Sequence, residues 1–340
     1  MNDPQAPARS EPLDRVDAFL ASSGLALRSH RVVPLAGDAS DRRYFRVLQD
    51  GSDSIVLALH AGPIAFASMP FANVSQLLRL MDIPAPAILG HDDRLGVIAL
   101  EDLGDETLQS RVGASSVTEH AGLYREAVSL IHRLQQRGHA LNSPAYVPYT
   151  LAFDEEKLTF ELEFFTTHFL EGHRRVALSS AERSALGTEW AAIAGELAAE
   201  PRVVCHRDYH SRNLMLHRER LHLIDFQDAR LGPDTYDLAS LLRDSYVDIT
   251  DAERDALLDH FIGLAGVTDS VEFRRRFDVM AVQRNLKALG TFGFQASARA
   301  NPGYVQYMPR TLLSVRTNLA KHDRFGTLRQ LLGAHVEELR

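Results

Sequence analysis

The sequence predicts an α+β fold of two lobes, a small β-rich N-terminal lobe followed by a mostly helical C-terminal lobe. Short segments of alternating hydrophobicity, separated by glycine, proline and aspartate, run through residues 31–100, as is typical of strands. Farther along the chain, apolar residues recur at helical spacing in long segments. At 340 residues the chain is long for one domain and sufficient for two lobes. We expect a disordered tail over residues 1–12, an N-terminal lobe over 13–103 and a C-terminal lobe over 104–340.

The composition is that of an ordinary globular protein, with 45% apolar and 24% charged residues. A net charge of −8 argues against a broad nucleic-acid interface. No stretch approaches ~20 uninterrupted apolar residues, so we expect no membrane span, and the polar N-terminus is unlike a secretory signal. The single cysteine, Cys205, excludes an intramolecular disulfide and fits a reducing compartment. We therefore expect a cytoplasmic monomer that binds neither nucleic acid nor membrane.

The elements of the N-terminal lobe follow from hydrophobic periodicity. Leu13, Val16, Phe19 and Leu20 share one helical face, so we expect a short amphipathic helix over residues 13–22. A second helix is expected over residues 71–81, where a proline-containing turn ends it. Strands are expected over residues 31–35, 43–47, 54–59, 87–89 and 96–100.

The turn between the first two strands, residues 37–41, is built from small and polar residues. A hairpin of this kind can lie over the phosphates of a nucleotide and bind them through backbone N–H groups. We place Ser40 against a phosphate, with Arg42 and Arg43 as further candidates beside it. The turn has one glycine, so an ordinary hairpin is the alternative interpretation of this segment alone.

The C-terminal lobe is predicted to be helical on both sides of a short strand-rich stretch. Glu182 lies three residues after Ser179, which is the pattern of a capping box. Four phenylalanines between residues 160 and 169 lie at helical spacing and are interpreted as core. Helices are expected over residues 119–137, 154–171, 179–199, 235–246, 251–266, 270–294, 304–321 and 324–339.

Residues 203–244 contain most of the candidate chemistry. Asp208 follows an apolar run, Asn213 comes five residues later, and Asp225 ends a further short strand. Phosphoryl transfer from ATP requires such a set. One carboxylate accepts the proton of the attacking hydroxyl, while the amide and the second carboxylate hold Mg²⁺. We assign Asp208 as the base and Asn213 and Asp225 as metal ligands; a polar turn between core strands is the alternative.

The spacing H-x-D-x-x-x-x-N followed by a strand-borne aspartate is a kinase signature. His206 begins it here, and a second histidine, His210, gives the form H-x-D-x-H-x-x-N. This form resembles the aminoglycoside phosphotransferase and choline kinase family, which implies a protein kinase-like bilobal fold. By this resemblance His206 is counted with Asp208 as catalytic, and Asp237 supports the loop from below. The strand exit at residues 101–104 is then the hinge, where the Glu101 carbonyl and the Leu103 N–H read adenine; a strand that ends in a polar turn is the alternative.

One feature of the kinase pattern is missing from this chain. Protein kinases carry a lysine on the third strand, paired to a glutamate on the following helix. This sequence has no lysine before Lys157 and no glutamate between Glu11 and Glu101. We expect Mg²⁺, the loop amides and an arginine to bear more of the phosphate charge. A nucleotide-binding regulator without turnover is therefore a second interpretation.

The late helices show a charge asymmetry. No acidic residue occurs between Asp278 and Asp323, whereas six basic residues do. A solvated basic surface is one interpretation of this window. The functional interpretation is a site that attracts an anionic substrate, with Arg284 placed for a bidentate contact to a carboxylate. Such a site disfavours polycationic aminoglycosides.

Five segments together resemble one subfamily, the N-acetylmuramate/N-acetylglucosamine 1-kinases of Gram-negative cell-wall recycling. The segments lie within residues 31–320 and read GDASDRRYFRV, EDLGDETL, CHRDYHSRNLM, IDFQDARLGPDTYDLASLLRD and QRNLKALGTF. That subfamily also lacks the strand lysine.

The subfamily resemblance implies ATP- and Mg²⁺-dependent phosphorylation of the anomeric hydroxyl of an amino sugar. It places Asp228 and His210 near the sugar, and Arg284 or Lys287 at the lactyl carboxylate of N-acetylmuramate. Asp228 as the cap of a turn is the alternative. A kinase of the same fold acting on another alcohol, such as an aminoglycoside, choline or a sugar phosphate, also remains open.

Overall fold

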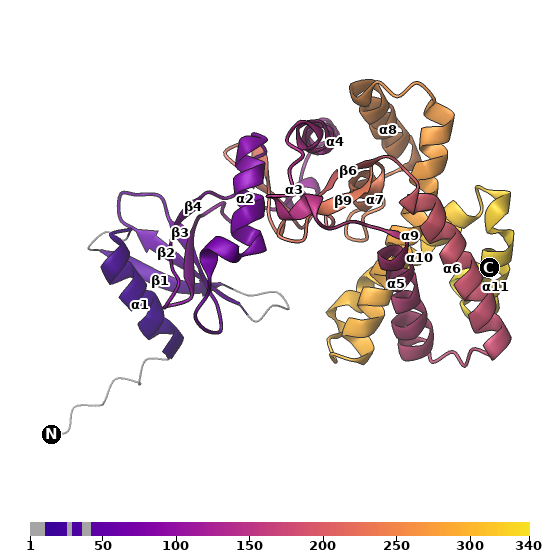
Figure 1. Ribbon diagram of the computed structural model, residues 1–340, viewed down its shortest axis with the longest axis horizontal. Helices are drawn as coiled ribbons and strands as arrows, with labels where there is room; N and C mark the ends of the chain where they lie inside the picture. Colours follow the sequence, from indigo (N-terminus) through magenta and orange to yellow (C-terminus); the bar gives the residue numbers. More distant parts are fainter. Residues whose placement is uncertain (1–10, 26–28, 36–41) are drawn as a thin grey trace.

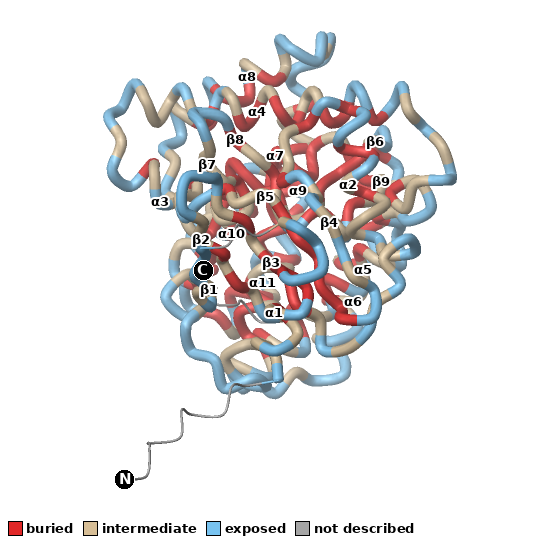
Figure 2. Tube along the Cα trace, turned by 90° about the vertical axis from the view of Figure 1, so that its left-hand side faces the viewer, coloured by how far each residue is buried: buried red, intermediate tan, exposed pale blue. Residues whose placement is uncertain are grey.

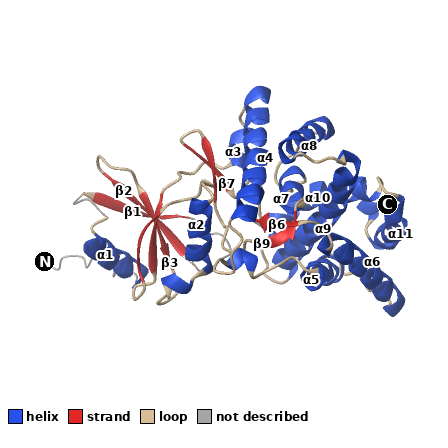
Figure 3. Cartoon of the chain, turned by 45° about the horizontal axis from the view of Figure 1, so that its top comes forward, coloured by secondary structure: helices blue, strands red, loops and turns tan. Residues whose placement is uncertain are grey.

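The computed structural model describes residues 11–25, 29–35 and 42–340, and the chain forms two lobes (Figure 1). The larger sheet and two helices form the N-terminal lobe, and the remaining helices gather in the C-terminal lobe (Figure 3). The predicted α+β fold with a β-rich first lobe is confirmed. The predicted tail lies outside the described residues except for Glu11 and Pro12, which are helical.

A five-stranded antiparallel sheet is the framework of the N-terminal lobe. Its strands lie in the order β1-β2-β3-β5-β4, and hairpins join β1 to β2 and β2 to β3. Each strand lies where hydrophobic alternation predicts it, within a few residues. The strands are β1 (His30–Leu35), β2 (Arg43–Gln49), β3 (Ile55–Leu59), β4 (Ile88–Asp92) and β5 (Val97–Glu101).

The two faces of this sheet pack against different helices. Helix α1 (Glu11–Ser23) buries its apolar side against the face that carries Phe45, Val47 and Leu57. The opposite face carries Ala58 and Leu100 and packs on the segment around η1 (Phe66–Ser68) and the start of α2 (Pro70–Leu80). Side chains alternate along each strand, so this second face is the one turned toward the C-terminal lobe.

Helix α2 connects the two lobes. Its buried residues Val74, Leu77 and Leu78 belong to the core of the C-terminal lobe. At its start, the ring of Phe71 stacks on Phe226 with 5.0 Å between ring centroids. Phe226 directly follows Asp225, so the stack ties the N-terminal lobe to the candidate metal site.

Helices surround two short antiparallel pairs of strands in the C-terminal lobe. Strand β6 (Arg202–Cys205) pairs with β9 (Arg230–Pro233), and β7 (Leu214–His217) pairs with β8 (Arg220–Leu223). The helices are α3 (Leu108–Val112), α4 (Val117–Ala140), α5 (Glu155–Phe165), α6 (Ser180–Ala198), α7 (Tyr236–Leu242), α8 (Asp251–Ala265), α9 (Ser270–Ser297), α10 (Met308–Leu319) and α11 (Gly326–His335). Within the described ranges no helix is long and apolar enough to cross a membrane.

Shorter helical turns complete the lobe: η2 (Val147–Tyr149), η4 (Pro302–Tyr307), η5 (Asp323–Phe325) and η6 (Glu337–Leu339). The capping box predicted at Ser179 and Glu182 is present. The helix predicted over residues 235–246 is shorter and ends at Leu242. It ends there because the Asp244 carboxylate accepts hydrogen bonds from the N–H groups of Ser211 and Tyr246, which pull the chain into a turn.

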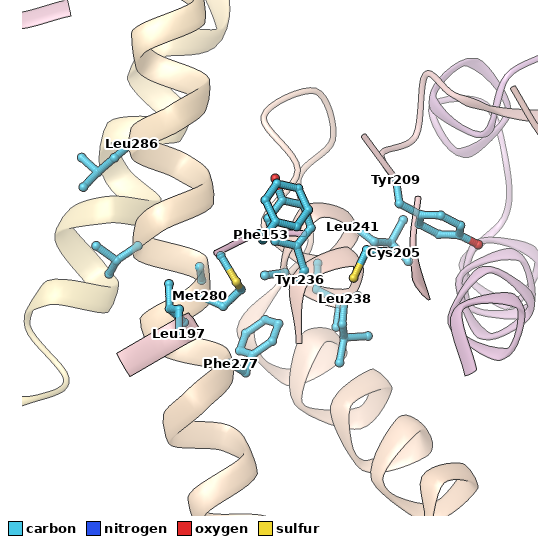
Figure 4. Packing of buried hydrophobic residues seen from close by; sticks show 14 of the residues in the cluster. Phe153, Leu197, Cys205, Tyr209, Tyr236, Leu238, Leu241, Phe277, Met280 and Leu286 are labelled. Carbon is cyan, nitrogen blue, oxygen red and sulfur yellow. The ribbon is translucent and has the colours of Figure 1, made fainter. Parts of the chain in front are cut away.

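A continuous buried core lies behind the strands of the C-terminal lobe, and Figure 2 shows buried segments in red running through the middle of the molecule. In the close view of Figure 4, the rings of Phe153 and Tyr236 overlap, with centroids 4.0 Å apart. Cys205, just before the candidate catalytic loop, Leu214, just after it, and Tyr209, within it, are all fully buried in this core. The loop is therefore held at both ends and in its middle by packed side chains.

Helix α9 packs closely on α5 and on the π-helical segment that follows it, η3 (Thr166–His173). Two glycines allow this approach. A Cβ added at Gly290 would lie 2.9 Å from the backbone of Phe165, and one added at Gly293 would overlap the backbone of His168. The predicted single helix over residues 154–171 is thus half α-helical and half π-helical.

We predict that Gly290→Ala destabilises the fold by about 1–3 kcal/mol, because the added methyl has no space against a helix backbone. Gly187→Ala is the matched control, since Gly187 is also helical but has no atom within 4 Å of its added Cβ. The control should stabilise by about 0.5–1 kcal/mol through helix propensity. Urea denaturation midpoints measure both changes, and equal midpoints for the two variants would contradict the packing argument.

Candidate active site

The loop from His206 to Asn213 connects β6 to β7 and carries the candidate base, Asp208. Its first turn is held by Asp237 of α7, whose carboxylate accepts hydrogen bonds from the N–H groups of His206 (2.6 Å) and Arg207 (3.0 Å). Arg207 has a φ of 86°, a left-handed conformation that is unfavourable for a residue with a side chain. Asp237 therefore lies beneath the loop and stabilises its strained turn.

His206 also acts on the backbone. Its side chain is buried, and Nε2 lies 2.9 Å from the carbonyl oxygen of Ile224. This contact joins the start of the catalytic loop to the residue before Asp225. His206 is thus a positioning residue for both carboxylates and does not face the cleft itself.

Asn213 and Asp225 lie at the two open ends of the β7–β8 hairpin. Leu214 pairs with Leu223, and the N–H of Ile224 donates to the Asn213 carbonyl at 3.1 Å. The side-chain amide of Asn213 donates from Nδ2 to the Asp208 carbonyl at 2.9 Å. Since Nδ2 is used in this way, Oδ1 is the atom left to bind a cation.

The pair Asn213 and Asp225 fits a magnesium ion of the kind that nucleotides carry. Amide and carboxylate oxygens are the donors that Mg²⁺ takes from proteins, usually in small number, with phosphates and waters completing the shell. Asp225 has a φ of 62°, and its Oδ1 accepts a 2.8 Å hydrogen bond from Gln227. Within the described residues no cluster of three or more His, Cys, Asp or Glu could hold a metal ion.

Asp208 is surrounded by cations. Its Oδ1 lies 3.2 Å from Lys287 Nζ and 3.8 Å from an Arg284 nitrogen, and its Oδ2 lies 3.8 Å from Arg207 Nε. Burial raises the pKa of the Asp208 carboxyl, but Lys287, Arg284 and Arg207 outweigh burial and hold that pKa well below its usual range. Asp208 is therefore ionised at every physiological pH.

Arg284 and Lys287 reach Asp208 from α9. Arg284 is buried and donates to the Tyr236 hydroxyl at 3.1 Å and to Ser240 Oγ at 2.6 Å. Lys287 also lies 3.9 Å from Oε1 of Glu161, a buried carboxylate on α5. Both predicted substrate residues are thus at the site, and both contact the base itself.

The basic window between Asp278 and Asp323 is not the open positive surface that its sequence predicts. Arg310 pairs with Asp248, and Lys321 pairs with Asp278 at 2.6 Å. Asp248 lies 62 positions before Arg310, and Asp278, which bounds the window, lies 43 positions before Lys321, so sequence spacing within the window does not reveal these pairs. The two window residues that contribute charge to the site are Arg284 and Lys287.

A cavity of about 120 Å³ opens beside Asp208. His210 lines it, with its ring edge-on to Tyr246 at 5.2 Å between centroids, and its Nδ1 has no hydrogen-bond partner among the described residues. Burial lowers the pKa of His210 despite the nearby Asp244 and Asp208. A buried, unpaired ring nitrogen beside the base is suited to a hydroxyl or amide of an acceptor. The remaining lining residues include Ser240, Arg284, Asn285, Lys287, Thr291 and Phe292.

Asp228, a further predicted substrate residue, lies on the other side of the base. Its Oδ2 forms an ion pair with a guanidinium nitrogen of Arg207 at 2.9 Å, and the Asp228 side chain is half exposed. Asp228 thus neutralises the arginine that faces Asp208 while leaving part of its carboxylate open to a ligand.

The predicted adenine-binding segment lies at the end of β5, close to the β7–β8 hairpin. Glu101 ends β5 and Leu103 is buried just beyond it. Just past this strand, the Glu106 carbonyl accepts a hydrogen bond from the N–H of Leu216 in β7. Thr107 also forms an isolated β-bridge with Met215 of β7. This places the strand exit directly above the hairpin that carries Asn213 and Asp225, as a hinge requires.

The structure distinguishes the two predicted phosphate arginines, and Ser40 lies outside the described residues. Arg43 shares its face of β2 with Phe45 and Val47, the face that packs on α1. Arg42, in contrast, is close enough to Tyr44 for its charge to oppose the effect of burial, which raises the pKa of that phenol. Strand alternation therefore makes Arg42 the better candidate for a phosphate contact.

Sequence reasoning did not identify Arg46 or Glu161. Arg46 lies opposite Val56 on the cleft face of the sheet and forms a bidentate ion pair with Asp102 (Nε to Oδ2, 2.7 Å), with further bonds to Asp105 and the Gly104 carbonyl. It ties β2 to the hinge. The alternation of β2 gives the face of Arg46, but no sequence signal gives its partners, and Glu161 appears in the sequence as an ordinary helix residue.

Comparison with known proteins agrees with this geometry. The model of the phosphotransferase enzyme family matches residues 31–273. The chain belongs to this family. It is therefore an enzyme that transfers phosphoryl groups, and its predicted membership is confirmed.

Two curated relatives carry the same name, N-acetylmuramate/N-acetylglucosamine kinase. The protein of Neisseria meningitidis is 32% identical over 308 residues, covering 87% of this chain and 88% of the relative. The protein of Pseudomonas aeruginosa is 30% identical over 328 residues, covering 94% and 92%.

Solved structures share the fold at low sequence identity. A choline/ethanolamine kinase family protein from Mesorhizobium loti superposes with a TM-score of 0.61 at 17% identity, covering 97% of this chain and 99% of that one. A macrolide 2′-phosphotransferase from Brachybacterium faecium gives a TM-score of 0.56 at 16% identity, covering 88% and 98%. The bilobal fold is thus that of small-molecule kinases.

We predict that Asp237→Asn lowers phosphotransfer at least ~100-fold and destabilises the protein by about 1–3 kcal/mol. The amide keeps one acceptor but leaves one loop N–H buried without a partner, and the turn at Arg207 relaxes. Asp248→Asn is the control, because Asp248 forms an exposed ion pair with Arg310, which contributes at most ~1 kcal/mol. Activity assays and urea denaturation give both readouts; wild-type turnover in the Asp237 variant would refute this role.

Proposed function

We propose that the protein is an ATP-dependent kinase that phosphorylates the anomeric hydroxyl of N-acetylmuramate, N-acetylglucosamine or both, giving the sugar 1-phosphate. The observation that carries this proposal is the convergence of Asp208, Asn213 and Asp225 with Lys287 and Arg284 beside the base. The names of the two relatives support the choice of acceptor.

In this proposal the acceptor hydroxyl lies against Asp208 in the cavity lined by His210. Asp208 accepts the hydroxyl proton as the bond to phosphorus forms, and ADP leaves with the electron pair of the broken P–O bond. The proton affinity of Asp208 is low because of its cationic neighbours, so this transfer is late and the developing charge is carried by surrounding groups. Asn213 and Asp225 would hold Mg²⁺, which supplies charge neutralisation of the phosphates.

The charges beside the base support an acceptor without positive charge. An aminoglycoside or choline would bring a cation within a few ångströms of Lys287 and Arg284, a like-charge contact that is unfavourable in a partly buried site. An N-acetylated sugar is neutral, and a lactyl carboxylate is attracted. Peptidoglycan recycling is a process that supplies such sugars.

The nucleotide is proposed to lie between the cleft face of the sheet and the β7–β8 hairpin. There the backbone of Glu101 and Leu103 reads the base, and Arg42 lies toward the phosphates; the contact predicted for Ser40 lies outside the described residues. ATP and a single, buried Cys205 fit a cytoplasmic enzyme, and we propose that it acts as a monomer.

The decisive experiment incubates the protein with ATP, Mg²⁺ and either sugar. We expect a sugar phosphate from at least one of them, with phosphorus NMR placing the phosphate on C1. A panel containing kanamycin, choline and N-acetylglucosamine 6-phosphate tests the other acceptors. Phosphate transfer to a panel member but to neither sugar would show that the proposed acceptor is wrong. Nucleotide binding with no transfer at all would favour the interpretation as a nucleotide-binding regulator without turnover.

Two variants separate the roles of the carboxylates. Asp208→Asn should lower kcat by ~10²–10⁴-fold while leaving the affinity for MgATP within about threefold. Asp225→Ala should lower activity and also weaken MgATP binding at least ~10-fold, because a metal ligand is lost. Isothermal titration with MgATP and with metal-free ATP measures this difference, and similar affinities for both nucleotides in wild type would show that Asp225 has been misassigned.

A further inference from the structure

The third strand, which in protein kinases carries the phosphate-binding lysine, is apolar in this protein. The residues of β3 on the cleft face are Val56 and Ala58, and neither can contact a phosphate by charge. A lysine–glutamate pair nevertheless exists at the site, on the opposite side of the cleft. It consists of Lys287 on α9 and Glu161 on α5.

Glu161 is built into the core of the C-terminal lobe for contact with cations. Its side chain is 4% exposed, and its Oε2 accepts a 3.0 Å hydrogen bond from Gln283. Its Oε1 has no hydrogen-bond partner in the part of the chain that the structure describes, and it lies 3.9 Å from Lys287 and 3.7 Å from Lys157. Burial raises the pKa of the Glu161 carboxyl, but Lys287, Arg284 and Gln283 outweigh burial, and the net shift is downward. Glu161 thus keeps its charge and attracts Lys287.

The other cations around the base are already occupied. Arg284 donates to Tyr236 and Ser240 and stacks over the Tyr236 ring at 4.8 Å. Arg207 forms its short ion pair with Asp228. Lys287 has three rotatable donors on a flexible stem, lines the cavity beside Asp208, and contacts Asp208 at 3.2 Å and Tyr236 at 3.4 Å.

Lys287 lies close enough to the base for its ammonium group to reach the phosphoryl group during transfer. An attacking hydroxyl must lie about 2.6–3.2 Å from Asp208, and the phosphorus about 3–3.5 Å beyond that hydroxyl. Lys287 Nζ contacts the same carboxylate, so a rotation of its last torsions brings it to an oxygen of the transferred phosphoryl group. No backbone movement is required.

We propose that Lys287, positioned by Glu161, binds the phosphoryl group during its transfer and thereby replaces the lysine that the N-terminal lobe lacks. This inference rests on the proposed kinase function and extends it. A bond forms between the acceptor oxygen and the γ-phosphorus, the bond to the β–γ bridging oxygen breaks, and the proton goes to Asp208. Lys287 remains protonated throughout and stabilises the equatorial oxygens electrostatically.

The alternative role for Lys287 is recognition of an acceptor carboxylate, and the two proposed sugars separate these roles. N-acetylmuramate has a carboxylate, whereas N-acetylglucosamine has none. If Lys287 binds the phosphoryl group, Lys287→Met lowers kcat ~10²–10³-fold for each sugar that wild type uses, with both KM values within about threefold. A rise in KM confined to N-acetylmuramate would overturn the proposal.

Three further variants supply controls. Lys287→Arg keeps the charge and should recover at least ~10-fold of the lost kcat. Lys157→Met removes the other lysine beside Glu161, which has no contact with Asp208 among the described residues, and should keep kcat within about threefold. Wild-type MgATP affinity in every variant shows that the fold is intact, and equal kcat for Lys287→Met and wild type would refute the proposal.

The pH profile gives an independent readout. Burial, Arg284 and Arg207 lower the pKa of Lys287, whereas Asp208 and Glu161 raise it. The lowering effects are larger, and the pKa of Lys287 is about 8. Lys287 is charged below this pH and neutral above it, so wild-type kcat/KM should fall as the pH rises through about 8. Lys287→Arg should lack this decrease up to pH 10, and Glu161→Gln should shift it to lower pH, because one stabilising carboxylate is lost.

The same variants test the proposal if neither sugar is an acceptor. Wild type is then assayed with the alcohol from the panel that it phosphorylates, or with water through its basal ATP hydrolysis. Lys287→Met should lower either rate at least ~100-fold. Unchanged rates would refute the role of Lys287, whereas a loss of rate without sugar phosphorylation would refute only the choice of acceptor.

Discussion

The site depends on one buried carboxylate that takes no part in the chemistry. Asp237 accepts the N–H groups of His206 and Arg207, and these two bonds stabilise a left-handed turn at Arg207 that the chain would not adopt alone. Burial raises the pKa of Asp237, and His206 together with the two backbone N–H groups opposes that rise. The direction of Asp208 follows from this turn. Through His206 and the Ile224 carbonyl, the same turn also fixes where β8 delivers Asp225.

The balance of charge around Asp208 distinguishes this site from one built for cationic acceptors. Asp208 and Glu161 face Lys287, Arg284 and Arg207, and Asp228 offsets the last of these. The cations come from the C-terminal lobe, whereas β3 of the N-terminal lobe supplies only Val56 and Ala58 to the cleft. The charge that a protein kinase carries on its third strand is thus absent from β3, and the cations beside Asp208 lie on α9 and on the loop after β6. In the proposed mechanism, the nucleotide and the acceptor share one electrostatic environment.

Local patterns in the sequence predicted the elements well, because short-range rules determine them. The spacing of Asp208, Asn213 and Asp225 follows from a loop and a tight hairpin, and both are local in the chain. Strand alternation, applied strictly, would also have excluded Arg43. Pairings across the fold were not predictable in this way: Glu161 and Gln283 are 122 positions apart, and Arg310 and Lys321 find partners outside their acid-free window. The π-helical turn of η3 likewise results from tertiary packing against α9.

The close packing at the glycines of α9 determines how near Lys287 lies to the helices beneath it. Gly290 and Gly293 let the helix rest directly on the backbone of α5 and η3, and Lys287 lies one turn before them, with Glu161 on the helix beneath. The distance between the two helices therefore sets the distance between Lys287 and Glu161. A helix raised by one methyl group would separate these two side chains even with every cavity residue unchanged. Remodelling of the cavity wall on α9 must therefore preserve the glycine contact with α5 and η3.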